Sequence, residues 1–513
     1  MGYDKPTDPR RDVGLWRWAT AAALLFAAFH LVAASRGPFE CGWLGHNGAR
    51  YAQIARNHAR LGLTHLHGAP LLDAGVPDQA HPDVYGHHPP ALAWTIALVF
   101  RAAGVSESAA GAVPVVATCL LLLLFAWLVR AVAGPRAAAF AVLAAVAQPM
   151  LSVYGAHIDV QGSPVLLGSV ATLAGYVHWR RGGRVAWMLA ASALASAFDW
   201  YGLYMPVVCA AHLAWTAPRR RAAAVALALW AVSLFGAWLT WLCTLPGVTP
   251  TSVLVAAGVR GASALTAAGV PLGAPVSAWL STTLELMPAW PGWLAMAVWV
   301  SWRLRPSGHG CRPEVHGAVG ASGLIVMLLL PPLVHALLFS AGLLMHGYWL
   351  FALPLPLALA SGLVLSRSPG WVAWPAIGLL LVVGADRARG VLAERDPLPV
   401  LIGSALAGNT APADVVLTNY DVNPFDPDGT GDRYVLLRPE VTFYADRVVR
   451  GGLKTAAALA DARLRRPDAD WFLLTPWPQP PAPELERAVR EAAAGEPIRL
   501  SEQPPVLLFR LGT

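Results

Sequence analysis

Charge is what this sequence has least of. Only 13% of its 513 residues are charged, roughly half the share of about 25% in ordinary soluble domains, and 56% are apolar. The charges are also unevenly distributed, because residues 387–513 hold 32 of the 67. This composition excludes an ordinary soluble enzyme. It predicts a membrane domain over residues 1–386 and a water-exposed domain over residues 387–513.

Cysteine is also scarce. The five cysteines are far apart in the sequence and form no CxxC pair, which argues against a disulfide framework. We expect them to act as small apolar side chains, and the predicted topology permits only one bridge, Cys41 to Cys243.

A basic stripe with interleaved aromatics is missing too. The net charge of +7 comes from basic residues in short loops between apolar runs, so nucleic acid is not an expected partner.

Long apolar runs, in contrast, are abundant. A helix that crosses a bilayer needs about 20 apolar residues, or fewer if its neighbours compensate. The sequence therefore predicts a mainly α fold, a polytopic membrane helical bundle with about 11 spans. The expected spans are 15–34, 108–129, 137–153, 162–178, 185–198, 203–217, 222–243, 290–302, 317–342, 348–366 and 371–385.

The short loops between these spans alternate in charge. By the positive-inside rule, the arginine-bearing loops are cytoplasmic. We therefore predict a multi-pass protein of the inner (plasma) membrane with a cytoplasmic N-terminus and an uncleaved first span. A further apolar stretch, 90–104, contains Arg101 and would invert the later spans if it crossed, so we expect it to be re-entrant or interfacial. The arginines that set the orientation are Arg130, Arg136, Arg180, Arg181, Arg184, Arg219–Arg221, Arg303, Arg305, Arg312 and Arg367.

This orientation places several polar segments on the outer face. They are the loop 36–89, the loops that carry Asp159, Asp199 and Glu285, and the C-terminal region. A single extracytoplasmic site could draw on all of them. The C-terminal region itself is predicted to be a small extracytoplasmic α/β domain. Its expected strands are Val415–Thr418, Trp471–Thr475 and Val506–Arg510, and its expected helices are Leu453–Arg466 and Pro483–Ala494.

The outer loop 36–89 holds 7 of the 15 histidines. In its first half, Tyr51, Ile54, Ala55 and His58 recur at helical spacing, so we predict a helix that lies on the membrane surface and turns its arginines toward other faces, beside membrane lipid phosphates. The loop has no HxxxH pattern, and His65-x-His67 is its closest histidine pair. We therefore assign no metal ligands, although a divalent cation stays possible.

The loop ends in the sequence Tyr85-Gly-His-His-Pro-Pro. Neither Pro89 nor Pro90 can donate a backbone hydrogen bond, and Pro89 restrains the residue before it. The prolines therefore hold His88 at the level of the lipid headgroups.

These residues resemble a known class, the polyprenyl-phosphate-sugar-dependent membrane glycosyltransferases of the GT-C fold, in particular the protein mannosyltransferase and aminoarabinose transferase branch. The resemblance rests on a first span followed by a long outer loop, on Asn47-x-x-x-Tyr51-x-x-x-Ala55, and on Tyr85 to Trp94 at the next apolar segment. Asp159, which follows a span ending in Gln148-Pro149, and the C-terminal domain also fit.

The resemblance implies a lipid-linked sugar donor that enters from the membrane, and an outer-loop carboxylate that assists attack by the acceptor. Where relatives carry that acid, this chain has Asn47, and an amide cannot act as a base. The base is then Glu40, His46 or Asp159, with Asp159 preferred. The implied donor-phosphate ligands are His88, His87, Arg56 and Tyr85, and the candidate cavity residues are Tyr51, Asp199, His346 and Tyr348. Asp199 could instead cap the following helix, and His346 and Tyr348 could instead belong to an aromatic belt.

The expected activity is therefore transfer of a sugar, hexosyl or pentosyl, from polyprenyl phosphate to an extracytoplasmic glycan, lipid or protein. Two alternatives come from other classes. Because Asn47 replaces the acid, the chain could be a catalytically inactive GT-C-like scaffold. Because polar residues lie within the membrane, it could also be a lipid or solute transporter. A transporter should show internal repeats and broken helices at matching positions, and the sequence shows neither.

Overall fold

The structure is a computed structural model of the chain. It describes residues 9–40, 42–75, 82–251, 253, 258, 271, 273–286, 294–300, 319–345, 347–420, 439–476, 480–502 and 504–512. The chain divides into two compact units. Unit 1 comprises residues 1–36, 86–92 and 111–393, and unit 2 comprises residues 37–85, 93–110 and 394–513. The outer loop thus groups with the C-terminal region.

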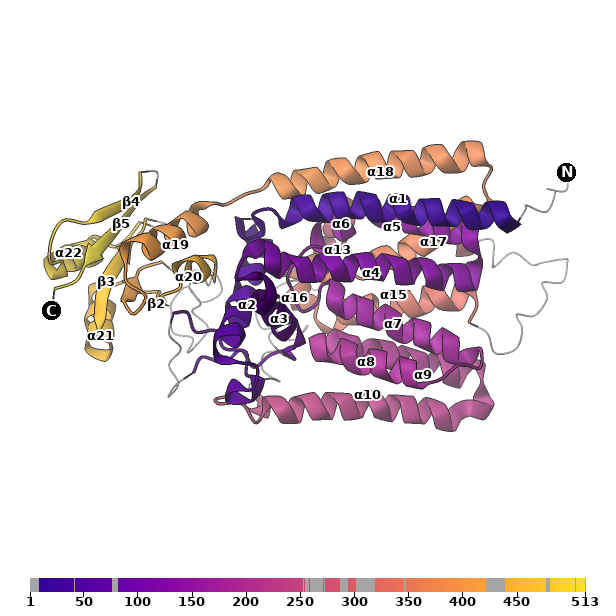
Figure 1. Cartoon of the computed structure of the whole chain (residues 1–513), viewed down its shortest axis with the longest axis horizontal. Helices are drawn as coiled ribbons and strands as arrows, with labels where there is room; N and C mark the ends of the chain where they lie inside the picture. The colour runs from indigo at the N-terminus through magenta and orange to yellow at the C-terminus, as the bar shows by residue number, and fades with distance from the viewer. Residues whose placement is uncertain are drawn as a thin grey trace. The chain divides into compact units, whose positions relative to one another are not determined.

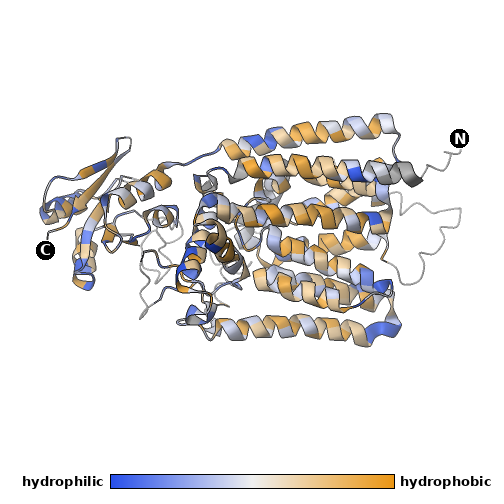
Figure 2. Cartoon of the chain, viewed as in Figure 1, coloured by the Kyte–Doolittle hydropathy of each residue, from blue (hydrophilic) through white to orange (hydrophobic). Residues whose placement is uncertain are grey.

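Unit 1 is a bundle of helices, and its long members run alongside one another (Figure 1). Hydrophobic residues dominate along their length (Figure 2). The helices are α1 (Pro9–Ser35), α4 (Glu107–Ala133), α5 (Pro135–Val146), α6 (Pro149–Tyr154), α7 (Ser163–Arg180), α8 (Ala186–Phe198), η3 (Trp200–Leu203), α9 (Tyr204–Thr216), η4 (Pro218–Arg220), α10 (Arg221–Leu242), α13 (Gly273–Leu286), α15 (Ala321–Leu338), α16 (Ser340–Met345), η5 (Gly347–Leu350), α17 (Pro354–Arg367) and α18 (Gly370–Ala393).

Among the described residues, four helical stretches are long and apolar enough to cross a membrane: Trp16–Ala33, Glu107–Ala133, Pro218–Leu242 and Ala321–Leu338. The total of about 11 spans stays a prediction. One expected span, 137–153, is two helices instead of one. The break falls between Val146 and Pro149, because proline lacks the N–H that would continue the hydrogen-bond ladder.

The centre of unit 1 is built from small side chains. Helix α5 is alanine-rich and almost wholly buried, and it packs against α1 and α17. A Cβ atom added at Gly362 of α17 would lie 2.6 Å from the carbonyl oxygen of Ala137. Backbones therefore approach closely here, as small residues allow in membrane helix packing.

The arginine-bearing loops of unit 1 that the structure describes meet at one end of the bundle. Arg136 Nη2 donates to the carbonyl of Ser368 at 2.9 Å, Arg181 donates to the carbonyl of Ala131, and Arg180 Nη1 donates to Thr216 Oγ1 at 3.2 Å. Helices α7 and α8 each have one end in this region. Their other ends, next to Asp159 and Asp199, therefore lie at the opposite end of the bundle.

Unit 2 combines short helices with one five-stranded sheet. Parallel pairing joins β2, β1 and β3, and antiparallel pairing joins β3, β5 and β4, so the strand order is β2-β1-β3-β5-β4. Its elements are η1 (Pro38–Glu40), α2 (Gly42–Leu61), η2 (His65–Gly68), α3 (Ala91–Ala103, which begins in unit 1), α19 (Leu398–Asn409), β1 (Val415–Thr418), α20 (Pro439–Ala445), β2 (Val448–Arg450), α21 (Ala456–Arg465), β3 (Ala469–Leu474), α22 (Pro483–Ala492), β4 (Ile498–Glu502) and β5 (Pro505–Arg510).

The expected strands and helices of the C-terminal region all form, within two or three residues of their predicted ends. Strands β2 and β4 were missed. Both are edge strands, β2 has only three residues, and β4 has no fully buried residue, so neither shows the hydrophobic pattern that signals a strand. Helix α3 has 13 residues and is about 20 Å long, which is shorter than the hydrocarbon core of about 30 Å.

Helix α2 confirms the helix predicted in the outer loop. The expectation for its arginines is wrong at Arg56, which is only 5% exposed. Tyr51, Ile54, Ala55 and His58 are buried as well. The helix is enclosed on more than one face, because it packs against α20 of the C-terminal region as well as η1.

Candidate functional site

Unit 1 holds a histidine–carboxylate pair where the chain leaves the outer loop. His88 Nδ1 donates to Asp199 Oδ1 at 2.8 Å. Asp199, the residue between α8 and η3, is 1% exposed. The next residue, Trp200, donates its indole N–H to the carbonyl of His87 at 2.8 Å. Two contacts thus fix the His-His-Pro-Pro segment to the end of α8, and the carboxylate sets the orientation and tautomer of the His88 ring.

Aromatic and histidine side chains surround this pair. The hydroxyl of Tyr204 lies 3.2 Å from His335 Nδ1, and the ring of His335 contacts those of Tyr201 and Trp349 at 5.5 and 5.2 Å. Asp199 Oδ2 and His335 Nε2 are buried and have no hydrogen-bond partner. Buried ionisable groups within a membrane bundle are costly and mark functional sites. Tyr204 and His335 had no signal in the sequence, since each lies within an apolar run.

Asp159 lies in the same unit, in the loop between α6 and α7. Its side chain is buried, Oδ1 accepts the backbone N–H of Gln161 at 2.9 Å, and Oδ2 lies 3.7 Å from His157 Nε2. Asp159 is therefore a second buried carboxylate beside a histidine, at the end of the bundle that also carries Asp199.

The first turns of α2 bring together four of the predicted residues in unit 2. His46 and Asn47 are buried, and the rings of Tyr51 and Tyr85 meet edge to face at 6.0 Å. The residue that links them is Arg50. Its Nη2 lies 2.7 Å from His46 Nε2, and its guanidinium stacks over the Tyr85 ring at 5.8 Å.

On its other ring nitrogen, His46 faces the C-terminal region, where Glu440 Oε2 lies 3.7 Å from His46 Nδ1. Glu40 also faces that region, since its Oε2 pairs with Arg395 Nη1 at 3.3 Å. Both candidate bases of the outer loop are thus held in contacts with the C-terminal segment of unit 2.

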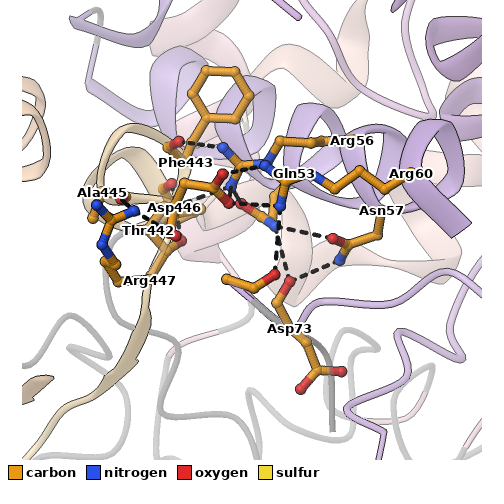
Figure 3. Close-up of polar contacts among 12 residues, drawn as sticks. Gln53, Arg56, Asn57, Arg60, Asp73, Thr442, Phe443, Ala445, Asp446 and Arg447 are labelled. Atoms are coloured by element: carbon orange, nitrogen blue, oxygen red, sulfur yellow. Dashed lines mark hydrogen bonds and ion pairs between the residues drawn. The ribbon is translucent and has the colours of Figure 1, made fainter. Parts of the chain in front are cut away.

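A larger polar network joins the middle of α2 to α20 (Figure 3). Arg56 donates to the carbonyl of Phe443 at 2.7 Å and to Gln53 Oε1. Its Nη2 also lies 3.1 Å from Asp446 Oδ1, and Arg60 pairs with the same carboxylate. Burial lowers the pKa of Arg56 to about 10, although the charge of Asp446 opposes that shift.

The same helix holds the loop that follows it. Gln53 Nε2 and Asn57 Nδ2 donate to the backbone carbonyl of Asp73 at 2.8 and 2.7 Å. Burial is the main cause that raises the pKa of the Asp73 carboxyl to about 6. Burial, with the charge of His65, lowers the pKa of His58 to about 4, so His58 is neutral near pH 7. Asp73 is a buried acid that the sequence analysis did not single out, because nothing in its local sequence marks it as buried.

Two predicted cavity residues contribute no side-chain geometry. His346 lies outside the described residues, and Tyr348 is known only as part of the η5 backbone. Cys41, the one partner expected for Cys243, also lies outside them. Within the part of the chain that the structure describes, no group of three or more His, Cys, Asp or Glu side chains could hold a metal ion.

Comparisons with known proteins identify the fold of the chain. No protein-family model matches the chain, and no curated protein matches its sequence. Among solved structures it is similar to ArnT from Cupriavidus metallidurans bound to undecaprenyl phosphate, with a TM-score of 0.60, 16% identity and coverage of 97% of this chain and 98% of that one. The apo form of ArnT gives a TM-score of 0.54 at 16% identity, covering 96% and 98%.

A third similar structure is the Archaeoglobus fulgidus oligosaccharyltransferase tethered with an acceptor peptide. Its TM-score is 0.51 at 11% identity, and the match covers 96% of this chain and 74% of that one. The chain therefore has the fold of these GT-C membrane glycosyltransferases, which confirms the resemblance stated from the sequence. At these identities the likeness concerns the fold.

Proposed function

We propose that the protein is a membrane glycosyltransferase that moves a sugar from a polyprenyl-phosphate donor to an acceptor outside the cytoplasm. The observation that carries this proposal is the shared fold, which extends over nearly the whole chain and nearly the whole of an ArnT structure bound to undecaprenyl phosphate. The buried His88–Asp199 pair in unit 1 supplies polar groups suited to a phosphate within an otherwise apolar bundle.

The reaction exchanges one bond for another at the anomeric carbon. A hydroxyl oxygen of the acceptor attacks that carbon, the bond to the phosphate oxygen breaks, and configuration inverts. The hydroxyl proton passes to a base on the protein, and polyprenyl phosphate leaves with the electron pair of the broken bond. The protein must therefore stabilise negative charge on the phosphate and accept one proton.

His88 is the proposed ligand of the departing phosphate. In its protonated form the imidazole makes charge-assisted hydrogen bonds to phosphate oxygens. Asp199 would act as a positioning residue, because its hydrogen bond to Nδ1 fixes the ring. The adjacent residue His87, held through its carbonyl by Trp200, keeps the segment in place. Arg56 is less suited to this role than expected, since its guanidinium is already committed to Asp446 and Phe443.

Asp159 is the proposed base. It belongs to the same unit as His88, and its carboxylate is buried beside His157, where it keeps the acid–base capacity that Asn47 lacks. Glu40 is a weaker candidate because it pairs with Arg395. The loop carrying Asp159 is proposed to face the exterior, because it lies at the end of the bundle opposite its arginine-bearing loops. The C-terminal domain is likewise proposed to be extracytoplasmic.

Reconstitution tests this proposal directly. The full chain in proteoliposomes should release free polyprenyl phosphate from a lipid-linked sugar when an extract of envelope acceptors is present. Mass spectrometry of surface glycans and lipid-linked sugars in a deletion strain should identify donor and product. A strain with unchanged glycans, together with a purified chain that releases no polyprenyl phosphate, would favour the inactive scaffold.

A further inference from the structure

Unit 2 contains a small polar pocket to which neither the proposed phosphate ligand His88 nor the proposed base Asp159 belongs. The cavity has a volume of about 150 Å³. Its walls come from α2, from the loop that follows α2, from the start of α20 and from β2. The charged and polar side chains among the lining residues are Arg50, Gln53, Asp73, Asp83, Thr442 and Arg450.

Asp73 is held firmly at this pocket. Its carbonyl accepts the two amide hydrogen bonds from α2, and its Oδ2 accepts the backbone N–H of Asp83 at 2.9 Å. Figure 3 shows the carboxylate pointing away from the arginines and amides of the α2 network. The backbone of Asp73 is thus held in place, and its carboxylate points away from Arg56 and Arg60.

The pocket combines hydrogen-bond acceptors and donors. Asp73 is only 8% exposed, and the opposing charges of Asp83 and Arg450 both act on its carboxyl. Arg50, whose guanidinium is oriented by His46 and by the Tyr85 ring, contributes donors from the α2 wall. A hydroxyl group both donates and accepts, so a ligand rich in hydroxyls can satisfy carboxylates and guanidiniums together.

We propose that this pocket binds one hydroxyl-bearing sugar ring, with Asp73 accepting hydrogen bonds from its hydroxyls and Arg50 and Arg450 donating to them. The pocket is small, about 150 Å³, which suits a single sugar ring as the bound unit. The choice of a sugar rests on the proposed transferase function, whereas the pocket and its buried carboxylate do not. The ring belongs either to the donor or to the acceptor.

Binding to the purified full chain in detergent tests the proposal without requiring turnover. The ligands are a panel of free hexoses, pentoses and N-acetylated amino sugars, with inorganic phosphate as a separate arm, and binding is followed by saturation-transfer NMR and calorimetry. We expect at least one sugar to bind. Asp73→Asn should weaken that binding roughly tenfold to a hundredfold, the usual effect of losing hydrogen bonds to a charged group.

Two further variants sharpen this test. Ala74→Leu fills the pocket, whose wall includes Ala74, and keeps every charge, so it should also abolish binding. The matched control is Asp468→Asn, which removes an exposed carboxylate paired with Arg466 outside the pocket and should leave sugar binding unchanged. Sugar affinity that is equal in Asp73→Asn, Ala74→Leu and the control would overturn the proposal, as would binding of phosphate without any sugar or of no ligand at all.

A competition experiment shows whether the bound sugar ring belongs to the donor or to the acceptor. The undecaprenyl-phosphate-linked form of the bound sugar should displace the free sugar if the pocket holds the donor ring, and should leave it bound if the pocket holds an acceptor ring. These experiments distinguish failure of the sugar-binding proposal from failure of the transferase proposal. Sugar binding without any transfer would remove the transferase and keep the pocket, while transfer with no Asp73-dependent binding would do the reverse.

Discussion

Arg56 in α2 and Asp446, the residue that follows α20, form an ion pair that ties the outer loop to the C-terminal domain within unit 2, with Arg56 Nη2 3.1 Å from Asp446 Oδ1. Asp446 has a φ of 50°, a left-handed conformation that Asp and Asn tolerate better than most residues. Burial acts to raise its pKa, but the hydrogen bond from Arg60 and the charges of Arg56, Arg60 and Arg447 outweigh it, so the pKa of Asp446 is lowered.

Asp446→Asn should therefore destabilise unit 2. The substitution keeps size and backbone conformation, and removes the negative charge that compensates buried Arg56. We expect a loss of about 2 kcal/mol, measured as a lower melting temperature of the purified chain near pH 7. Because the pKa is lowered on folding, this contribution exists above the ordinary Asp pKa of about 4 and fades as the pH falls through the folded value.

Asp461→Asn is the matched control for Asp446→Asn. Asp461 pairs with Arg465 on the exposed surface of α21, where an ion pair contributes little. Equal melting temperatures for the two variants would contradict a stabilising role for the Arg56–Asp446 pair.

Asp73→Asn should have the opposite effect on stability. Its pKa is about 6 in the folded chain and about 4 in the unfolded chain, so the folded state holds the proton more tightly and stability falls as the pH rises from about 4 to about 6. Near pH 7 the ionised carboxylate costs at most about 3 kcal/mol. The asparagine variant should melt higher than the natural chain at pH 7, and the difference should disappear near pH 4.

His88→Ala should weaken use of the lipid-linked donor by roughly tenfold to a hundredfold, because one charge-assisted contact to phosphate is lost. Asp199→Asn should weaken it less, since the ring stays and only its orientation suffers. Transfer rates over a range of donor concentrations measure both. His178→Ala, an exposed histidine at the arginine-bearing end of the bundle, is the control, and donor kinetics that His88→Ala leaves unaltered would remove His88 from the site.

Replacing each candidate base by its amide counterpart shows which of them accepts the proton. Asp159→Asn should lower the transfer rate by about 10² to 10⁴, the usual effect of losing a general base, while Asn47→Ala should have a smaller effect. Glu40→Gln tests the alternative base. Should Glu40→Gln abolish transfer while Asp159→Asn stays active, the base is Glu40 and the assignment of Asp159 is wrong.

Orientation in the membrane follows from the loops that carry arginine. In a chain stripped of its natural cysteines, single cysteines at positions 108 and 161, which are accessible positions near residues 107 and 157, should react with an impermeant reagent from outside, and one near residue 133 should not. Labelling of residue 133 from outside would invert the proposed topology.

The sequence predicted the elements whose pattern is local. Helix α2, strand β1 and helices α21 and α22 follow from local spacing and composition, and the His88 segment was marked by its two prolines. Helices α19 and α20 of the C-terminal region were not predicted. The edge strands β2 and β4 were missed because they bury too little to show a period. The span 137–153 was predicted as one helix because its hydropathy is continuous, although Pro149 breaks it.

Composition by itself predicted a membrane-embedded part and a water-exposed part, since apolar runs of membrane length and a charged C-terminal region cannot share one environment. Only the tertiary structure decided what the polar side chains of those regions do. The sequence predicted Arg56 as a ligand of the donor phosphate and did not single out Asp73. Both are buried in the structure, where α2 and the loop after it meet the C-terminal region. Their altered pKa values arise from that burial and from partners distant in the chain, which no local pattern encodes.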